Sequence, residues 1–144
     1  MTQLTGQCHC GAVQVVLELV YPPSILPLRA CQCGFCRAHG AATTSHPESH
    51  LHIEAAPGAL SHYRFGRRAV DFLICRTCGV YVASTIEADG ERLATLNVNG
   101  VGIQDFAGRT PEPADYDHET DDERLVRRQA RWMPLILVET QPSA

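Results

Sequence analysis

The chain has 144 residues, of which 44% are hydrophobic and 19% charged, proportions typical of one soluble globular domain. It begins without a basic, apolar leader and contains no apolar run near the roughly 20 residues that span a bilayer. We therefore expect a cytoplasmic protein with no membrane partner. The formal net charge is −4, and all 12 basic residues are arginine. This acidic balance argues against nucleic acid as a partner.

Alternating and β-branched runs predict a series of short strands separated by turns. The expected strands are residues 12–19, 28–30, 51–53, 60–65, 70–74, 80–85, 93–98 and 135–138. Asp89-Gly90 indicates a tight turn between two of them, and the acidic, proline-containing residues 108–116 indicate a surface loop. Because we find no internal repeat and no linker, we expect a single mainly-β domain over residues 1–144.

One short helix is predicted near the C-terminus, over residues 120–130. Thr120 or Asp121 can cap its first turn, which is rich in acidic side chains, and arginines gather near its end. Both features match the polarity of the helix dipole. We expect Pro134 to end this helix.

Seven cysteines fall in three tight groups: Cys8 and Cys10; Cys31, Cys33 and Cys36; and Cys75 and Cys78. An odd number of thiols in a reducing compartment argues against a disulfide framework. Thiols one to three residues apart can instead reach one metal ion. Zinc takes four ligands in a closed structural site, or three where one position stays open for chemistry. Seven thiols therefore predict two zinc ions per chain.

The first and last cysteine groups have a similar local context, since each is followed by a glycine and then by a predicted strand. Two such knuckles can hold one zinc ion and tie the N-terminus to the middle of the chain. The alternatives are buried thiols without a ligand role, or a redox pair at Cys75 and Cys78. A redox pair would lack the helix start that lowers the pKa of such a thiol.

The middle group places three thiols within six residues, at Cys31, Cys33 and Cys36. It would complete a closed structural site if His39 or another side chain supplied a fourth ligand. It would otherwise form an open site for a substrate thiol or water. Three thiolates make zinc a weak Lewis acid, which suits a thiolate better than the ionisation of water. The spacing does not decide which groups share a metal.

At these residues the chain resembles the glutathione-dependent formaldehyde-activating enzyme family, which includes centromere-protein-V-like proteins. The resemblance lies in residues 6–13 (GQCHCGAV), 31–37 (CQCGFCR), 40–41 and 75–79 (CRTCG), and it covers roughly residues 4–100. It implies a β-tent of small antiparallel sheets around zinc, with residues 101–144 as a C-terminal extension. It also implies a structural zinc at Cys8, Cys10, Cys75 and Cys78, and a catalytic zinc at Cys31, Cys33 and Cys36.

The resemblance implies an activity as well, the joining of glutathione and formaldehyde to S-(hydroxymethyl)glutathione by a carbon–sulfur lyase. Arg37 is our candidate for binding a substrate carboxylate, with an ion pair at a sheet edge as the alternative. His39 is a candidate for proton transfer, with a surface role as the alternative. The chain departs from the family pattern at Ile74, where an aromatic residue is frequent, and in the histidine-rich residues 46–52.

A second class of function is a non-catalytic zinc-binding module for a protein partner. The β-tent fold is also used by a protein that binds small GTPases, so the fold alone does not decide between the two classes. The middle cysteine group argues for the enzyme, because a purely structural module does not need it. Metal content discriminates them, since the module needs one zinc per chain and the enzyme two.

Overall fold

The computed structural model describes residues 2–140. Its strands are β1 (Thr2–Gln7), β2 (Val13–Leu19), β3 (Arg29–Cys31), β4 (Thr43–Thr44), β5 (His50–Ala55), β6 (Leu60–Tyr63), β7 (Asp71–Cys75), β8 (Tyr81–Ala88), β9 (Glu91–Asn97), β10 (Glu112–Ala114) and β11 (Met133–Glu139). The α-helices are α1 (Gly34–Ala38) and α2 (Asp121–Arg131), and Pro23–Ile25 and Gln104–Phe106 form single 3₁₀ turns. No helix within residues 2–140 is long and apolar enough to cross a membrane.

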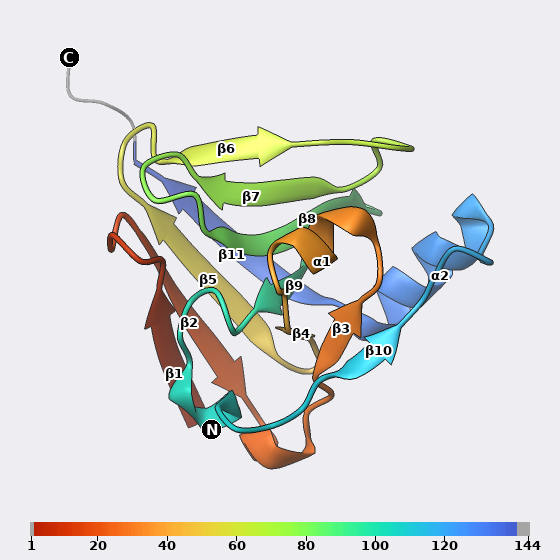
Figure 1. Cartoon of the computed structure of the whole chain (residues 1–144), viewed down its shortest axis with the longest axis horizontal. Coiled ribbons are helices and arrows are strands. Elements are labelled where there is room, and N and C mark those ends of the chain that lie inside the picture. The colour runs from red at the N-terminus through yellow and green to blue at the C-terminus, as the bar shows by residue number, and fades with distance from the viewer. Residues whose placement is uncertain (1, 141–144) are drawn as a thin grey trace.

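The strands form one branched, strongly twisted sheet in which β9 is the branch point (Figure 1). One edge of β9 pairs with β8, which continues through β7 to β6. The other edge is shared, since Leu93 and Ala94 pair with β11, and Leu96 and Asn97 pair with β4. From β11 the sheet continues through β5 and β2 to β1, and from β4 it continues through β3 to β10.

Most pairings are antiparallel, and the prediction of a mainly-β protein with one short C-terminal helix is confirmed. Two pairings are parallel, β11 with β5 and β10 with β3. Local sequence patterns did not predict these two pairings, because in each the partner strands are far apart in the chain. The central place of β11 also means that part of residues 101–144 completes the sheet, although the domain boundaries drawn from the sequence stay a prediction.

The core lies between the two arms of the twisted sheet. Alternate residues of β2 point inward, with Val13, Val15, Leu17 and Leu19 almost fully buried. They pack with apolar side chains from β5, β7, β9 and β11 in one continuous cluster. Two of the cysteines, Cys8 and Cys75, belong to this cluster.

Each of the eight predicted strands has a counterpart in the structure, and the predicted turn occurs at Asp89-Gly90, where both residues have positive φ. The capping of α2 is also as predicted: the Thr120 hydroxyl accepts a hydrogen bond from the Glu123 amide, and the Glu123 carboxylate accepts one from the Thr120 amide. Pro134 does not end this helix. The helix stops at Arg131, and Pro134 lies inside β11.

Six short elements were not predicted: β1, β4, β10, α1 and the two 3₁₀ turns. Among them, β10 lies inside the segment expected to be a loop, residues 108–116. It is a three-residue edge strand that pairs only with β3, a position where a proline such as Pro113 is tolerated.

Candidate metal centres and the adjoining cavity

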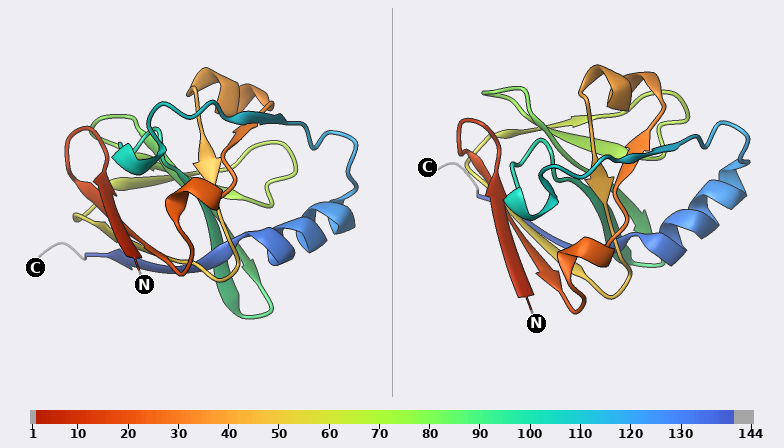
Figure 2. Two further views of the ribbon diagram at one scale, coloured as in Figure 1. Left: turned by 90° about the horizontal axis from the view of Figure 1, so that it is seen from below. Right: turned by 60° about the horizontal axis from the view of Figure 1, so that its bottom comes forward.

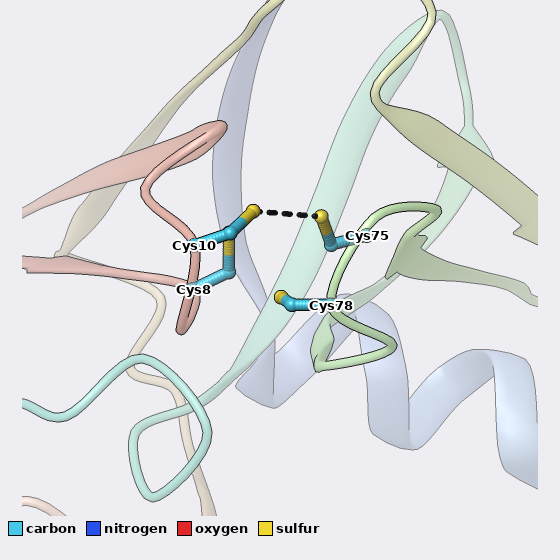
Figure 3. A group of neighbouring side chains, drawn as sticks. All are labelled: Cys8, Cys10, Cys75 and Cys78. Carbon is cyan, nitrogen blue, oxygen red and sulfur yellow. Dashed lines mark hydrogen bonds between the residues drawn. The ribbon is translucent and has the colours of Figure 1, made fainter.

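Four cysteines from two distant loops meet at one point, as Figure 3 shows. Cys8 and Cys10 lie in the turn between β1 and β2, while Cys75 ends β7 and Cys78 lies in the turn before β8. The Sγ atoms of Cys10 and Cys75 are 3.6 Å apart, and those of Cys8 and Cys10 are 3.7 Å apart. We call this group the four-thiol cluster.

The two loops fold alike because each has a glycine in a left-handed conformation just past its cysteines. Gly11 has φ +85° and Gly79 has φ +79°, a region that a side chain rarely adopts. The Gly11 amide donates to the Cys8 carbonyl (3.0 Å), and the Gly79 amide donates to the Cys75 carbonyl (2.9 Å). The Val13 amide also donates to the Cys8 sulfur (3.3 Å). The paired-knuckle geometry inferred from the sequence is therefore present.

The donor set and spacing of the four-thiol cluster fit a zinc ion. Four sulfurs around a zinc at about 2.3 Å in a tetrahedron lie about 3.8 Å from one another. The measured sulfur separations of 3.6 and 3.7 Å are close to this value. Burial opposes ionisation of Cys78, but hydrogen bonds from the Val80 and Cys10 amides outweigh it and lower its pKa to about 6. A thiol that ionises this readily is prepared for metal binding.

Cys31, Cys33 and Cys36 form a second group, the three-thiol cluster, within a single short segment. Their sulfurs lie within 4.8 Å of one another. Cys31 ends β3, Cys33 is the N-cap of α1, and Cys36 lies inside that helix. The Cys36 amide donates to the Cys33 sulfur (3.4 Å), so a thiol takes the capping role that Ser or Asp usually has. The structure thereby settles the grouping that the spacing left open.

The three-thiol cluster is arranged to carry negative charge unevenly. Hydrogen bonds from the Cys31 and Cys36 thiols, with further help from backbone amides, lower the pKa of Cys33 to about 2. The same contacts with Cys33 raise the pKa of Cys31, and contacts with Cys31 and Cys33 raise that of Cys36. Without a metal, the three thiols titrate as one coupled group, in which a first negative charge is favoured and further charges are opposed. A cation that binds all three sulfurs would relieve their mutual repulsion.

A buried asparagine fixes the chain that follows the three-thiol cluster. The Asn97 side chain on β9 accepts a hydrogen bond from the Ala42 amide (3.1 Å) and donates to the Tyr81 carbonyl (2.9 Å). Asn97 is 2% exposed, so both of these bonds are shielded from water. The segment after α1 is thereby attached to β8 and β9.

Aromatic rings surround the same cluster. Phe35, which lies between Cys33 and Cys36 in the sequence, has its ring centroid 4.5 Å from that of Phe72 and 5.0 Å from that of Tyr81. Phe65 stacks on Phe72 at 4.9 Å. The Tyr81 hydroxyl is hydrogen bonded to the Ser84 hydroxyl, and burial raises the pKa of this phenol well above its usual value.

A cavity of about 630 Å³ adjoins the three-thiol cluster. All three of its cysteines line the cavity, together with aromatic rings from β7 and β8 and arginines from β3 and α2. Its lining residues include Cys31, Cys33, Cys36, Phe72, Tyr81, Ser84, Arg29, Arg128 and Arg131. Within residues 2–140, none of the cysteines of the four-thiol cluster is among the lining residues.

Two further candidates from the sequence lie apart from this cavity. Arg37 is exposed on the last turn of α1, and His39, the C-cap of α1, is exposed with its ring against Phe35 at 4.5 Å. Neither is among the residues that line the cavity. Their proposed roles in substrate binding and proton transfer therefore stay predictions without geometric support.

The histidine-rich residues 46–52 do not converge on either cluster. His46 packs against Tyr21, with ring centroids 5.1 Å apart, and His52 Nε2 lies 3.4 Å from a Glu18 carboxylate oxygen. His50 begins β5 and is exposed. Sequence reasoning missed the arginines of the cavity. Their signal in the sequence is the spacing of Arg124, Arg128 and Arg131, which places these three on one face of α2.

The fold and the two thiol clusters define a small mainly-β domain with two candidate metal centres, one of them beside a cavity. Comparison with known proteins agrees with this class. The sequence profile described as "Glutathione-dependent formaldehyde-activating enzyme" matches residues 3–115, and the chain belongs to that family. The match ends before α2 begins at Asp121.

Among solved structures, the chain is similar to the crystal structure of a Rhodobacter sphaeroides protein determined in a structural genomics programme. The two are 31% identical with a TM-score of 0.56, and the alignment covers 77% of this chain and 100% of the other. Comparison with curated proteins finds no match.

Proposed function

We propose that this protein is a zinc-dependent carbon–sulfur lyase that joins glutathione, or a related small thiol, to formaldehyde. One observation carries the proposal: the three-thiol cluster lines a cavity of about 630 Å³, within the size range of small-molecule sites. The name of the family to which the chain belongs supplies the two substrates, glutathione and formaldehyde. A reducing, cytoplasmic location would keep the seven thiols available.

In this proposal each cluster holds one zinc ion, so the chain carries two. Cys8, Cys10, Cys75 and Cys78 supply a complete set of four ligands and serve the fold. Cys31, Cys33 and Cys36 would supply three ligands, and because all three line the cavity, a ligand in the cavity could supply the fourth. A zinc ion bound there would favour the thiolate form of a substrate thiol at that position.

The reaction forms one carbon–sulfur bond without oxidation or reduction. The substrate sulfur attacks the carbonyl carbon of formaldehyde, and the π electrons of the carbonyl bond move to oxygen, which then takes a proton. The thiol loses one proton, so the balance is neutral. The chain's contribution is to hold the two reactants together, since a well-oriented pair reacts far faster than separate molecules.

The proton for the new hydroxyl group can come from the hydrogen-bonded pair of Tyr81 and Ser84. Both residues line the cavity, and Tyr81 packs directly with Cys36. Because burial raises the pKa of Tyr81, its phenol stays protonated and can donate a hydrogen bond to a developing alkoxide. We assign this pair, rather than the exposed His39, to the oxygen of formaldehyde.

The rival function, a zinc module that binds a protein partner, is less well supported. A structural module has no use for a metal centre that opens into a cavity of this size. The exposed large apolar side chains within residues 2–140 are spread over several elements. An interface for a protein partner would more often gather such side chains in one patch.

The test uses zinc-loaded protein and ¹³C-labelled formaldehyde with glutathione in exchange-detected NMR. The rate at which formaldehyde and S-(hydroxymethyl)glutathione interconvert should rise in proportion to enzyme concentration. Metal analysis of the same sample should give two zinc ions per chain. An interconversion rate that does not respond to the enzyme would refute the lyase. Calorimetry with glutathione and S-methylglutathione then tests the sulfur contact, because the methylated form should bind poorly.

A further inference from the structure

The helix α2 turns a row of arginines toward the cavity. Arg124, Arg128 and Arg131 are spaced four and three residues apart and therefore share one face of the helix, and all three line the cavity. The apolar Val126 is 65% exposed instead. Figure 2 shows α2 as a rod that projects from the end of the sheet and leads into β11. The other large apolar residue of the helix, Leu125, is 42% exposed and lines the cavity beside the arginines. A surface helix usually turns apolar side chains inward, so a cavity-facing side made mostly of arginines needs a reason.

Some of the arginines on α2 have structural partners. Arg127 makes an ion pair with Glu119 at 3.0 Å and stacks over the Tyr116 ring at 3.5 Å. Arg124 donates to the backbone carbonyls of Glu119 (2.7 Å) and Tyr116 (3.0 Å). These contacts hold the loop before α2 against the helix. Arg124 and Arg127 therefore have a structural role.

Arg128, Arg131 and Arg29 have fewer contacts, and none of them has a carboxylate partner within residues 2–140. Arg128 is half-buried, and its Nε atom is buried without a hydrogen-bond partner in the part of the chain that the structure describes. Its guanidinium lies 5.6 Å from the Trp132 ring. Arg29, on β3, donates to the Ser45 hydroxyl (3.2 Å).

The positive charges next to Arg128 oppose its own charge, and the nearby Glu119 and Asp121 offset only part of this effect, while Arg131 is exposed. Burial, followed by the nearby Arg127 and Arg124, lowers the pKa of Arg128 to about 10. Burying a charge without a partner is costly. A chain that keeps such an arrangement beside a cavity is prepared for an anionic ligand that completes it.

We infer that Arg128, Arg131 and Arg29 bind a carboxylate group of the thiol whose sulfur lies at the three-thiol cluster. The inference rests on the proposed function and specifies its substrate class as a thiol that carries a carboxylate at some distance from sulfur. The arginines and the three cysteines line the same cavity, so one ligand can reach both. Arginine suits this task because its guanidinium binds a carboxylate through two hydrogen bonds.

Two of the three arginines, Arg128 and Arg131, lie beyond the residues that the family profile matches. In this assignment the cysteines provide the chemistry, and the C-terminal helix provides selectivity. Neutral thiols of similar size would reach the three-thiol cluster but leave the arginines unpaired. We therefore expect discrimination between charged and uncharged thiols to depend on α2.

The experiment compares glutathione with its diethyl ester, which keeps the thiol but masks both carboxylates. Calorimetry on zinc-loaded protein should give at least about tenfold weaker binding for the ester, the effect expected of one charged hydrogen bond. In Arg128→Gln and in Arg131→Gln, the affinity for glutathione should fall about tenfold. The ratio of the affinities for glutathione and its ester should then fall toward one. The matched control is Arg92→Gln, the same change at an exposed arginine on β9 outside this cavity, which should bind both ligands as the wild type does.

A third ligand, γ-glutamyl-alanyl-glycine, separates this inference from the lyase proposal, because it has the carboxylates but no sulfur. Its binding should also weaken about tenfold in Arg128→Gln. If it binds as tightly as glutathione, the sulfur contact and the proposed function fail while the carboxylate site stands. A different outcome would refute the carboxylate site and leave the lyase proposal standing. In that outcome glutathione binds better than the sulfur-free tripeptide, but Arg128→Gln and Arg131→Gln leave the affinity for both ligands unchanged. Loss of glutathione binding in Arg37→Gln instead would place the carboxylate on α1 and also refute the inference.

Discussion

The two thiol clusters use the same side chain but differ in what they join. Cys10 and Cys75 are 65 positions apart in the chain, and the four-thiol cluster ties together the loops that end β1 and β7. Cys8 and Cys75 are buried to 1% exposure or less and belong to the main core. The three-thiol cluster lies within one six-residue segment and faces a cavity. A metal at the first would act on the fold, and a metal at the second would act on a ligand.

The largest effect that tests this contrast should come from Cys75→Ser. The substitution leaves Cys8, Cys10 and Cys78 as an incomplete ligand set, with Cys8 buried in the core. Zinc binding contributes folding free energy of order 10 kcal/mol in small zinc domains. We expect loss of soluble protein, or a fall of the free energy of unfolding by several kcal/mol. Thermal unfolding and zinc analysis measure it, with Cys33→Ser as the matched control. A Cys75→Ser protein with unchanged Tm and zinc content would show that the cluster is not a metal site.

The control is itself the second prediction. Cys33→Ser should keep the circular dichroism spectrum and one tightly bound zinc, because the three-thiol cluster joins no distant segments. It should lose the second zinc and the binding of glutathione. A spectrophotometric chelator titration counts the remaining zinc. Failure of this variant to fold would mean that both clusters are structural, and the contrast between them would disappear.

The cysteine spacing predicted the clusters because metal ligands are set by local turns. The glycines at positions 11 and 79 marked the knuckles in advance, as both have positive φ in the structure. Whether Cys31, Cys33 and Cys36 formed their own site depended on the pairing of distant strands, which spacing does not report. The helix α1 was missed because it has only five residues and is capped by a sulfur.

Edge strands were the other main omission, and the reason is physical. Residues 2–7 (TQLTGQ) are largely exposed and pair with only one neighbour, β2, so they carry little hydrophobic pattern. The arginine face of α2 was visible as a spacing of four and three residues at positions 124, 128 and 131. Its inward orientation contradicts the usual rule for amphipathic helices. Only the tertiary structure reveals that a cavity lies behind it.

A third, smaller effect should come from Asn97→Ala, which tests how the three-thiol cluster is positioned. Removing the side chain leaves the Ala42 amide and the Tyr81 carbonyl without their buried partner, at a cost of about 1–3 kcal/mol. We expect a lower Tm together with weaker binding of the second zinc, while the first zinc is retained. Equal weakening of both zinc ions in a competition titration would contradict the independence of the clusters.

The fourth prediction concerns proton donation beside the three-thiol cluster. Tyr81→Phe removes the hydroxyl that bonds to Ser84 but keeps the ring that packs with Cys36 and Phe35. We expect kcat in the formaldehyde exchange assay to fall about a hundredfold, at the low end for loss of such a donor, with KM for glutathione little changed. His39→Gln is the matched test of the alternative donor. A loss of kcat in His39→Gln and not in Tyr81→Phe would move the proton donor to α1.

The smallest effect should come from an ion pair at the opposite end of β7 from Cys75. A hydrogen bond from Arg64 holds the pKa of Asp71 below its usual value, against the opposing effect of burial, and Asp71 also lies 3.5 Å from His62. A carboxyl whose pKa is lower in the folded state stabilises the protein at pH values above its unfolded pKa of about 3.9, and this contribution is lost as the pH falls through the lower folded pKa.

Because Arg64 is 53% exposed, water screens the pair, and Asp71→Asn should cost only about 0.5 kcal/mol at pH 7. The difference in unfolding free energy between Asp71→Asn and wild type should shrink as the pH falls below about 4. Urea denaturation of the Cys33→Ser background at pH 7, 5 and 3.5 measures it without interference from the second zinc. If Asp71→Asn lowered the unfolding free energy at pH 7 as much as Cys75→Ser does, the ion pair would stabilise the fold as strongly as the metal site. A difference at least tenfold smaller is what the contrast between the clusters requires, because a metal that joins two distant loops should far outweigh a half-exposed ion pair at the far end of β7.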